Sequence, residues 1–298
     1  MIILGISAFY HDSSATIIKD NEIIASAQEE RFTRIKHDNS FPLNSIDYCL
    51  NSSQIQLSEI DEVIYYENPN IKLFRILKSN FNQKNFLNLM QIFLGINKFF
   101  IKQKIKKILE NFYQQKVKKV VYSLHHKSHA LSAFIPSKYN EALVVCLDGV
   151  GEFHSTTVWS GKNGELDLIW KKNFPDSLGI LYSAFTYFCG FKVNFGEYKL
   201  MGLAPYGKPK FVDIIKKHII TANNDGDYFL NEKYFNFAGN QEIISDEFKK
   251  LFGIGRRNPE ENIKQVYMDL AASVQKIIEE VVLNICRYFS NKTGLKKL

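Results

Sequence analysis

Two stretches of the chain repeat one pattern of hydrophobic and polar positions, about 140 residues apart. In each stretch, three short apolar runs are separated first by a polar turn and then by a tight turn. The apolar runs of the first copy lie at 2–7, 15–18 and 23–28. The second copy begins with an apolar run at 142–147 and has its tight turn at 161–164. Short apolar runs bounded by turn residues predict β-strands, so the repeat predicts a duplicated fold.

The repeated unit resembles the phosphate-cradling hairpin of the actin-like ATPase superfamily. We therefore expect an α/β fold, an actin-like ATPase superfold with duplicated ribonuclease-H-like lobes and the nucleotide in the cleft between them. The expected first lobe is 1–140, with a helical insertion at about 68–116. The expected second lobe is 141–298, with an insertion at about 173–260 that includes a hairpin near 227–235.

An amphipathic helix is expected at 262–290, close to the end of the chain. In the first copy the pattern continues with a further strand and helix, and no such pair follows this helix. The second lobe is therefore expected to be incomplete, and the chain is expected to be a fragment. Such a fragment would leave an apolar sheet edge uncovered, so we expect the isolated chain to self-associate.

A candidate metal site is formed by His125, His129 and Asp148. The stretch 124–133 reads as the first turns of a helix, and residues at i and i+4 lie on one helix face. Asp148 stands at the end of the apolar run 142–147, where its carboxylate can meet both imidazoles. Two imidazoles and one carboxylate suit a divalent transition metal such as iron or zinc. The alternative is a helix of a basic protein that carries two histidines at this spacing by chance.

The turn that follows Asp148 is a candidate phosphate-binding segment. Gly149 and Gly151 leave backbone amides accessible to an anionic group, and the turn continues with Val150 and Glu152. A second candidate is a glycine-bracketed loop that the hairpin pattern does not require, because a loop of this kind in a lobe is commonly functional. Its candidate cofactor-binding residues are Glu197, Lys199 and Gly202.

Five ordered motifs resemble those of the carbamoyltransferases of the nodulation-factor and cephamycin type. They lie at 5–15, 29–38, 125–134, 147–152 and 196–207. The resemblance implies an N-terminal domain similar to the actin-like tRNA threonylcarbamoyladenosine synthase, followed by a separate YrdC-like domain. We expect that domain to be missing from these residues and to be needed as a partner, in cis or as a second chain. The resemblance also implies that carbamoyl phosphate and ATP form a carbamoyl-adenylate, whose carbamoyl group passes to a hydroxyl of a small-molecule or sugar acceptor. In that family, the positions of His125, His129 and Asp148 hold iron or a similar metal that contacts the nucleotide phosphate.

Three further residues are candidates for the transfer reaction. His11, in the turn of the first unit with Asp12 beside it, could act as a general base on the acceptor hydroxyl or could orient the carbamoyl group. Lys36 matches a family position that contacts the reacting anion, and Arg31 or Arg34 could share this role. The alternatives are a turn histidine bonded to local backbone and solvated charges. The remaining histidines are expected to be structural or solvated: His37, His126, His154 and His218.

The composition is that of a globular chain, with 45% hydrophobic residues and a formal net charge of +7. No apolar run reaches the roughly 20 residues that a membrane helix needs, and the N-terminus resembles no signal peptide, so we expect a cytoplasmic protein with no membrane partner. The positive charge suits anionic substrates. Four widely spaced cysteines are expected to be buried free thiols: Cys49, Cys146, Cys189 and Cys286.

Much of the positive charge falls in the lysine- and phenylalanine-rich segment 71–119. Such a segment can bind nucleic acid or a membrane surface. We favour a helical hairpin with apolar residues packed on the core and lysines in water, so no nucleic acid partner is expected. Gly95 and Asn97 would break its helices, and Phe99 and Phe100 could face the acceptor.

Carbamoyl transfer competes with two other functions. A sugar-kinase-like or other ATPase of the same superfold is possible, because a fold does not fix chemistry. Such kinases hold magnesium on carboxylates, so the histidine pair counts against them. A non-catalytic fragment that needs a partner chain is the third reading. For carbamoyl transfer, the 298 residues alone are expected to show weak, phosphate-dependent nucleotide binding and no turnover.

Overall fold

The computed structural model describes residues 1–81, 100–237 and 242–298. The chain forms two compact units, one of Met1–Lys78 and Lys84–Ser128 and the other of Ser79–Gln83 and His129–Leu298. The expected lobe boundary at 140 lies shortly after helix α6 (His125–Phe134), and the division between the units falls inside that helix. No helix among the described residues is long and apolar enough to cross a membrane.

The first unit is built on a mixed five-stranded sheet. Its strands are β1 (Ile2–Ser7), β2 (Ser14–Lys19), β3 (Glu22–Gln28), β4 (Glu62–Tyr65) and β5 (Val120–Tyr122). Their order is β3-β2-β1-β4-β5, with antiparallel pairs among the first three strands and parallel pairs from β1 to β4 and from β4 to β5. Three antiparallel strands extended by parallel strands through helical connections are the ribonuclease-H-like arrangement, as expected from the sequence.

Helices connect and cover this sheet. They are α1 (Glu30–Thr33), α2 (Leu43–Ser53), η1 (Leu57–Glu59), α3 (Pro69–Phe81) and α5 (Ile101–Tyr113). α2 buries Ile46 and Leu50 in the same core as Leu4 and Ile17 of the sheet. The buried Glu29 caps α2, because its carboxylate accepts bonds from the backbone amides of Asn44 and Ser45 at 3.2 and 2.8 Å.

The described residues of the basic segment include the amphipathic helix α5. α5 buries Ile101, Ile105 and Leu109, whereas Lys104 and Lys106 on its other faces are exposed. Burial of the apolar stripe with lysines in water confirms the expected packing for these residues. Phe100 is exposed at the start of α5. The expected roles of Gly95, Asn97 and Phe99 concern positions outside the described residues.

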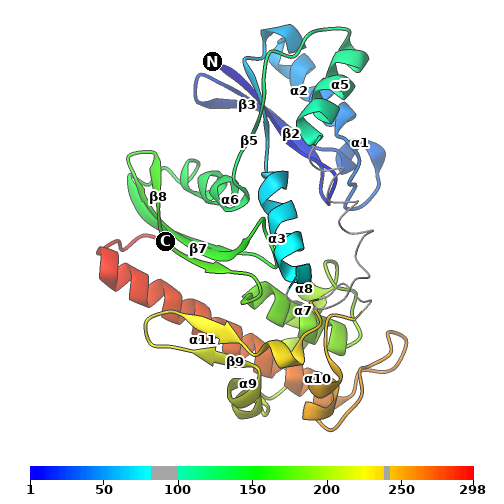
Figure 1. The fold of residues 1–298 in the computed structure, drawn as a ribbon, viewed down its shortest axis with the longest axis vertical. Helices are drawn as coiled ribbons and strands as arrows, with labels where there is room; N and C mark the ends of the chain where they lie inside the picture. The colour runs from blue at the N-terminus through cyan, green and yellow to red at the C-terminus, as the bar shows by residue number, and fades with distance from the viewer. Residues whose placement is uncertain (82–99, 238–241) are drawn as a thin grey trace. The chain divides into compact units, whose positions relative to one another are not determined.

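The second unit contains the second copy of the hairpin unit (Figure 1). Its strands are β6 (Glu141–Leu147), β7 (His154–Lys162) and β8 (Glu165–Asn173), all antiparallel and in the order β6-β7-β8. Ala130 and Phe134 of α6 pack against Ala142, Val144 and Trp159 of this sheet. α6 is therefore fixed on the sheet that carries Asp148.

The tight turns of the two copies have the same backbone conformation. The β2–β3 turn has positive φ angles at Asp20 and Asn21, of 49° and 70°. The β7–β8 turn has them at Asn163 and Gly164, of 50° and 83°. Two consecutive residues with positive φ form the two-residue hairpin turn whose twist matches the flanking strands. The repeat seen in the sequence is thus present in the backbone.

The rest of the second unit is mainly helical. Its elements are α7 (Leu178–Phe188), α8 (Glu197–Leu203), η3 (Ala204–Tyr206), α9 (Val212–His218), β9 (Ile220–Ala222), β10 (Tyr228–Leu230), η4 (Glu232–Tyr234), α10 (Asp246–Leu251) and α11 (Gln265–Thr293). The core joins α7 to α11, through Leu181 and Phe185 on α7 and Leu270, Val274 and Ile277 on α11. α11, the long red helix of Figure 1, confirms the helix expected at 262–290.

Two local expectations for this unit are wrong. The residues 197–203 form helix α8 rather than a loop, because Leu200 and Leu203 lie on one face and are buried in the core. The hairpin expected near 227–235 is formed by β9 and β10, so it lies at 220–230, and η4 follows it. The cysteines are free as expected; Cys49, Cys146 and Cys189 are buried, and Cys286 is half-buried.

Candidate metal and phosphate site

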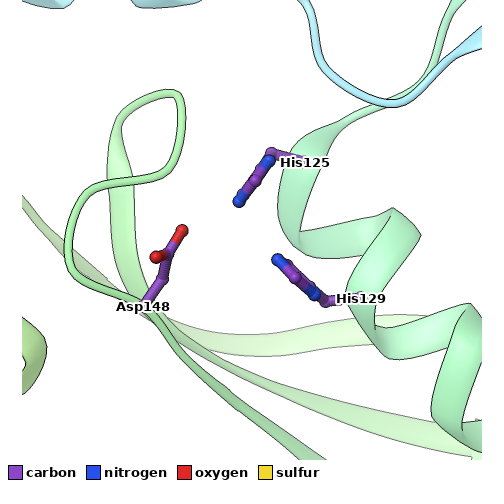
Figure 2. A group of neighbouring side chains, drawn as sticks. All are labelled: His125, His129 and Asp148. Carbon is purple, nitrogen blue, oxygen red and sulfur yellow. The ribbon is translucent and has the colours of Figure 1, made fainter. Parts of the chain in front are cut away.

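The three side chains expected to hold a metal lie together. One ligand atom from each of His125, His129 and Asp148 can be chosen so that all three atoms lie within 4.8 Å of one another. Figure 2 shows both imidazoles, from successive turns of α6, turned toward the Asp148 carboxylate at the end of β6. His125 and Asp148 are half-buried and His129 is exposed, so the group is reachable from solvent.

The first turn of α6 is held by its own neighbours. The Ser128 hydroxyl donates to the Tyr66 carbonyl at 3.0 Å. The Tyr66 ring contacts His125 edge-on, with 5.5 Å between ring centroids. On an adjacent face of the helix, Ala130 and Phe134 are buried against the β6–β7 sheet. Both imidazoles therefore project from a helix whose position is set by packing, which limits the ways in which they can turn.

The Asp148 turn is clamped to the start of α7. The backbone amide of Asp148 donates to the Ser155 carbonyl at 2.9 Å. The Ser177 hydroxyl lies 3.0 Å from the Asp148 carbonyl and 2.6 Å from the Gly149 carbonyl, and it accepts a bond from the Ile180 amide at 3.0 Å. Ser177 is thus both the N-cap of α7 and a tie to the turn. Sequence reasoning did not single out Ser177, although a serine before an apolar run is an N-cap signal.

Close backbone approach makes this clamp specific to glycine. A Cβ built on Gly179 would lie 2.6 Å from the Gly149 Cα and 2.8 Å from the Asp148 carbonyl carbon. Such contacts do not occur between real atoms, so a side chain at 179 would push the turn away. By contrast, a Cβ on Gly149 would meet nothing within 4 Å. One face of the Gly149 backbone is therefore packed on α7, and the other is open to a ligand.

The residues expected to cradle phosphate lie in this turn. Gly149 and Val150 are half-buried, and Gly151 and Glu152 are buried. The N-terminal end of α7 abuts the turn, and the partial positive charge of a helix N-terminus favours an anion nearby. The donor set of His125, His129 and Asp148 also fits a transition metal, since two imidazoles and a carboxylate leave coordination positions for other ligands. The surroundings are thus suited to a metal-bound anionic ligand.

A second polar cluster surrounds Asp12. Its carboxylate accepts a bond from His11 Nδ1 at 2.7 Å and one from His37 Nδ1 at 3.0 Å. Glu30 accepts a bond from the backbone amide of His37 at 3.0 Å. Both Asp12 and His37 have left-handed backbone conformations, with φ angles of 49° and 58°. Residues other than glycine rarely adopt this backbone conformation, and those that do are concentrated at functional sites.

The charge state of Asp12 defines how His11 can act. Burial would raise the pKa of the Asp12 carboxyl, but the hydrogen bonds from His37 and His11 outweigh it, so the pKa lies below its ordinary value of 3.8. An ionised carboxylate accepts protons in hydrogen bonds, so both imidazoles donate through Nδ1. In a neutral His11 the lone pair is then on Nε2, the atom that would accept a proton from a substrate. His37, which was expected to be structural or solvated, shares the Asp12 carboxylate with His11.

The other expected site residues are more scattered. Lys36, Arg31 and Arg34 are exposed around the short helix α1 and the loop after it. Glu197 is turned inward, since its carboxylate accepts bonds from the Ser183 hydroxyl at 2.9 Å and the Asn194 amide at 3.0 Å. That carboxylate therefore orders the start of α8.

Two more of the expected site residues, Lys199 and Gly202, lie on α8. Three of the other histidines are not members of the metal group. Lys199 is exposed on α8, and a Cβ on Gly202 would point into open space. His126 is buried; His154 bonds to Asn173 at 2.6 Å, and His218 approaches the Tyr234 hydroxyl at 3.4 Å. Asn173 and Tyr234 are not among the residues expected to bind metal or phosphate.

The fold and the site define an α/β protein of the actin-like class, with a two-histidine, one-carboxylate group beside a glycine turn. The sequence matches the carbamoyltransferase N-terminus family over residues 2–298, and the chain belongs to that family. It is 46% identical to an uncharacterized protein of Synechocystis sp., over 99% of this chain and 49% of that protein. It is 32% identical to the nodulation protein NolNO of Sinorhizobium fredii, over 98% of this chain and 40% of that protein.

The chain thus spans about half of the length of these relatives, or less. Among solved structures, it is similar to (R)-2-hydroxyglutaryl-CoA dehydratase component A of Acidaminococcus fermentans, with 11% identity and a TM-score of 0.43 over 100% of this chain and 90% of that one. It is also similar to YeaZ from Pseudomonas aeruginosa, with 12% identity and a TM-score of 0.33 over 59% of this chain and 70% of that one.

Proposed function

We propose that this chain is the N-terminal part of an O-carbamoyltransferase. The activity would transfer a carbamoyl group from carbamoyl-adenylate, made from carbamoyl phosphate and ATP, to a hydroxyl of a small-molecule or sugar acceptor. The observation that carries the proposal is the joint position of His125, His129 and Asp148 beside the glycine turn. Family membership supports carbamoyl transfer as the chemistry.

In this proposal His125, His129 and Asp148 hold one divalent metal, with iron as the first candidate. When bound, the metal would supply positive charge to the phosphate of the nucleotide. The protein's part is to hold the turn at 149–152 against α7, where its backbone would be available to the anion. Ser177 and Gly179 fix this geometry, and they act through the Asp148 turn rather than on the ligand.

His11 and Lys36 are proposed to act on the reacting groups. The acceptor oxygen attacks the carbamoyl carbon as the bond from that carbon to the adenylate oxygen breaks, and the hydroxyl proton passes to His11 Nε2. Asp12 fixes His11 in the required tautomer and stabilises the imidazolium that forms. Lys36 is proposed to neutralise the adenylate that leaves, which requires the exposed side chain to reach it.

The two alternatives make different predictions. A kinase of the actin-like class would hold magnesium on carboxylates, and the paired imidazoles favour a transition metal instead. The other alternative is a non-catalytic chain that needs a second polypeptide. It would have the same site, and it differs from the proposal only in that a second chain supplies the remaining residues. Because the longer relatives extend well beyond the aligned region, we propose that a C-terminal YrdC-like region completes the activity.

The experiment incubates the chain with ATP, carbamoyl phosphate and candidate hydroxyl acceptors, alone and with the remaining half of the Synechocystis relative. Mass spectrometry follows carbamoyl-adenylate, carbamoylated acceptor, AMP and ADP. We expect no turnover by the chain alone, and carbamoylated acceptor and AMP in the mixture, both lost with His125→Ala. Formation of ADP and a phosphorylated acceptor would support the kinase alternative. Unchanged carbamoylation of the acceptor with His125→Ala would contradict the proposed site.

A further inference from the structure

The second unit contains a cavity of about 830 Å³ at the opposite end of α7 from the Asp148 turn. Gly179, near the start of α7, touches the Gly149 backbone, and Tyr187, near its end, lines the cavity. α7 has 11 residues and is therefore about 16 Å long. The cavity is thus about one helix length from the glycine turn, and its volume is in the range of small-molecule sites.

Positive side chains line this cavity. Lys192 and Lys199 are exposed, and Arg256 is half-buried. In the described part of the chain, none of these three forms an ion pair. Among the lining residues that the structure describes, only Glu260 carries a carboxylate. The described lining therefore has an excess of positive charge, which favours an anionic ligand.

A fourth positively charged residue, Arg257, orders part of the cavity wall. The buried Arg257 donates through Nε to the Cys189 carbonyl at 2.7 Å and through Nη1 to the Asn258 and Pro259 carbonyls at 3.1 and 3.0 Å. A Cβ on Gly190 would lie 2.6 Å from the Arg257 carbonyl oxygen. These contacts hold the wall in place without a ligand, and a preformed wall reduces the entropy lost on binding.

Aromatic rings provide the apolar part of the lining. The Arg256 guanidinium lies over the Tyr187 ring, 4.0 Å from its centroid, and its Nε donates to the Tyr187 carbonyl at 3.0 Å. Phe191 and Phe237 are further lining residues. A stacked guanidinium is held with its plane fixed, so its remaining donors can meet a planar anionic group in a defined orientation. Aromatic rings and positively charged side chains therefore line the same cavity.

We propose that this cavity binds a small molecule in which a planar aromatic ring carries an anionic group, a phosphate or a carboxylate. The ring would pack on Tyr187, Phe191 and Phe237, and the anion would meet Lys192, Lys199 and Arg256. The site is separate from the metal residues, and the proposal does not depend on carbamoyl transfer. Lys199, a candidate cofactor-binding residue in the sequence analysis, is one of the residues that line this cavity.

Isothermal titration calorimetry of the whole chain tests the site, with phenyl phosphate and benzoate as probes. Inorganic phosphate and phenol supply the anion and the ring separately. We expect one of the two combined probes to bind at least about tenfold more tightly than either component, since charged and apolar contacts both contribute. Preference for phenyl phosphate or for benzoate identifies the anion. Absence of binding, or equal affinity for inorganic phosphate and phenyl phosphate with no affinity for benzoate, would overturn the proposal.

Variants locate the binding. The double variant Lys192→Gln/Lys199→Gln changes two exposed side chains, so its fold should be retained, and we expect the affinity of the preferred probe to fall about tenfold. Tyr187→Leu should weaken binding of the ring-bearing probe by a larger factor than binding of inorganic phosphate, because it removes a ring contact as well as the stack on Arg256. Lys217→Gln, an exposed cation on α9 outside the lining, is the charge-matched control. His129→Ala should leave binding intact. An equal loss of probe affinity in Lys217→Gln, or a loss of probe affinity in His129→Ala, would overturn the assignment.

Discussion

Gly179 and Gly149 lie in direct backbone contact, since a Cβ on Gly179 would be only 2.6 Å from the Cα and from the amide nitrogen of Gly149. This contact joins the first turn of α7 to the turn that follows Asp148. The Ser177 hydroxyl bonds to the same turn from the N-cap position. The position of the Asp148 carboxylate therefore depends on residues about 30 positions later in the chain.

Gly179→Ala should displace the Asp148 turn and weaken metal binding about tenfold or more, because loss of the contacts that position a metal ligand commonly costs this much. The metal content of the purified variant, measured by elemental analysis, checks the prediction. Gly202→Ala is the matched control, since Gly202 lies in helix α8 and its added Cβ would meet nothing within 4 Å. That control should keep its metal and gain slightly in stability, because alanine favours helix over glycine. Equal metal loss in both variants would contradict this account.

Asp12→Asn should lower kcat for carbamoyl transfer by roughly ten- to a hundredfold with little change in KM, because His11 would lose its ionic partner and its fixed tautomer. The assay is steady-state kinetics of the chain supplemented with the C-terminal half of a relative. Metal content should not change, since Asp12 is not among the proposed metal ligands. A change confined to KM would assign Asp12 to acceptor binding instead.

Asp269→Asn should destabilise the second unit by about 2 kcal/mol at pH 7. Burial would raise the pKa of Asp269, but bonds from Lys210 at 2.7 Å, Gln265 at 2.9 Å and the Lys208 amide at 2.9 Å lower it to about 2, against an ordinary value of 3.8. A lowered pKa stabilises the fold above the unfolded-state value, and this stabilisation is lost as the pH falls from about 4 to about 2.

Urea unfolding at several pH values checks this prediction. The difference in the free energy of unfolding between parent and variant should be full at pH 7 and should shrink below pH 4. Asp246→Asn is the control, because Asp246 has a side chain that is 77% exposed and should show little effect. A difference that stays constant down to pH 2 would show that Asp269 acts through packing rather than through its charge.

The strands, the hairpin turns and the histidine helix could be predicted from the sequence because local patterns determine them. Apolar runs, the Asp20–Asn21 turn and the i, i+4 spacing of His125 and His129 are all short-range signals. The distance between β6 and the start of α7, and hence the Ser177–Gly179 clamp, depends on tertiary packing, so the sequence alone could not locate it.

The error at α8 has a similar origin. Gly196 and Gly202 suggested a loop, yet buried Leu200 and Leu203 place 197–203 in a helix against the core. Tertiary burial outweighed the low helix propensity of glycine there. The contact between Asp12 and His37 was missed because 25 residues separate them, and tertiary packing of the β1–β2 turn on the loop after α1 brings them together.

Metal binding by the whole chain tests the central claim most directly. Apo protein is titrated with Fe(II) under anaerobic conditions and with Zn(II), and bound metal is measured by elemental analysis for the parent, His125→Ala, His129→Ala and Asp148→Asn. His218→Ala is the control, since His218 lies on α9 beside Tyr234. We predict one metal per parent chain, unchanged in His218→Ala and reduced at least about tenfold in affinity in the other three variants. Parent-level metal binding in His125→Ala and His129→Ala would contradict the account.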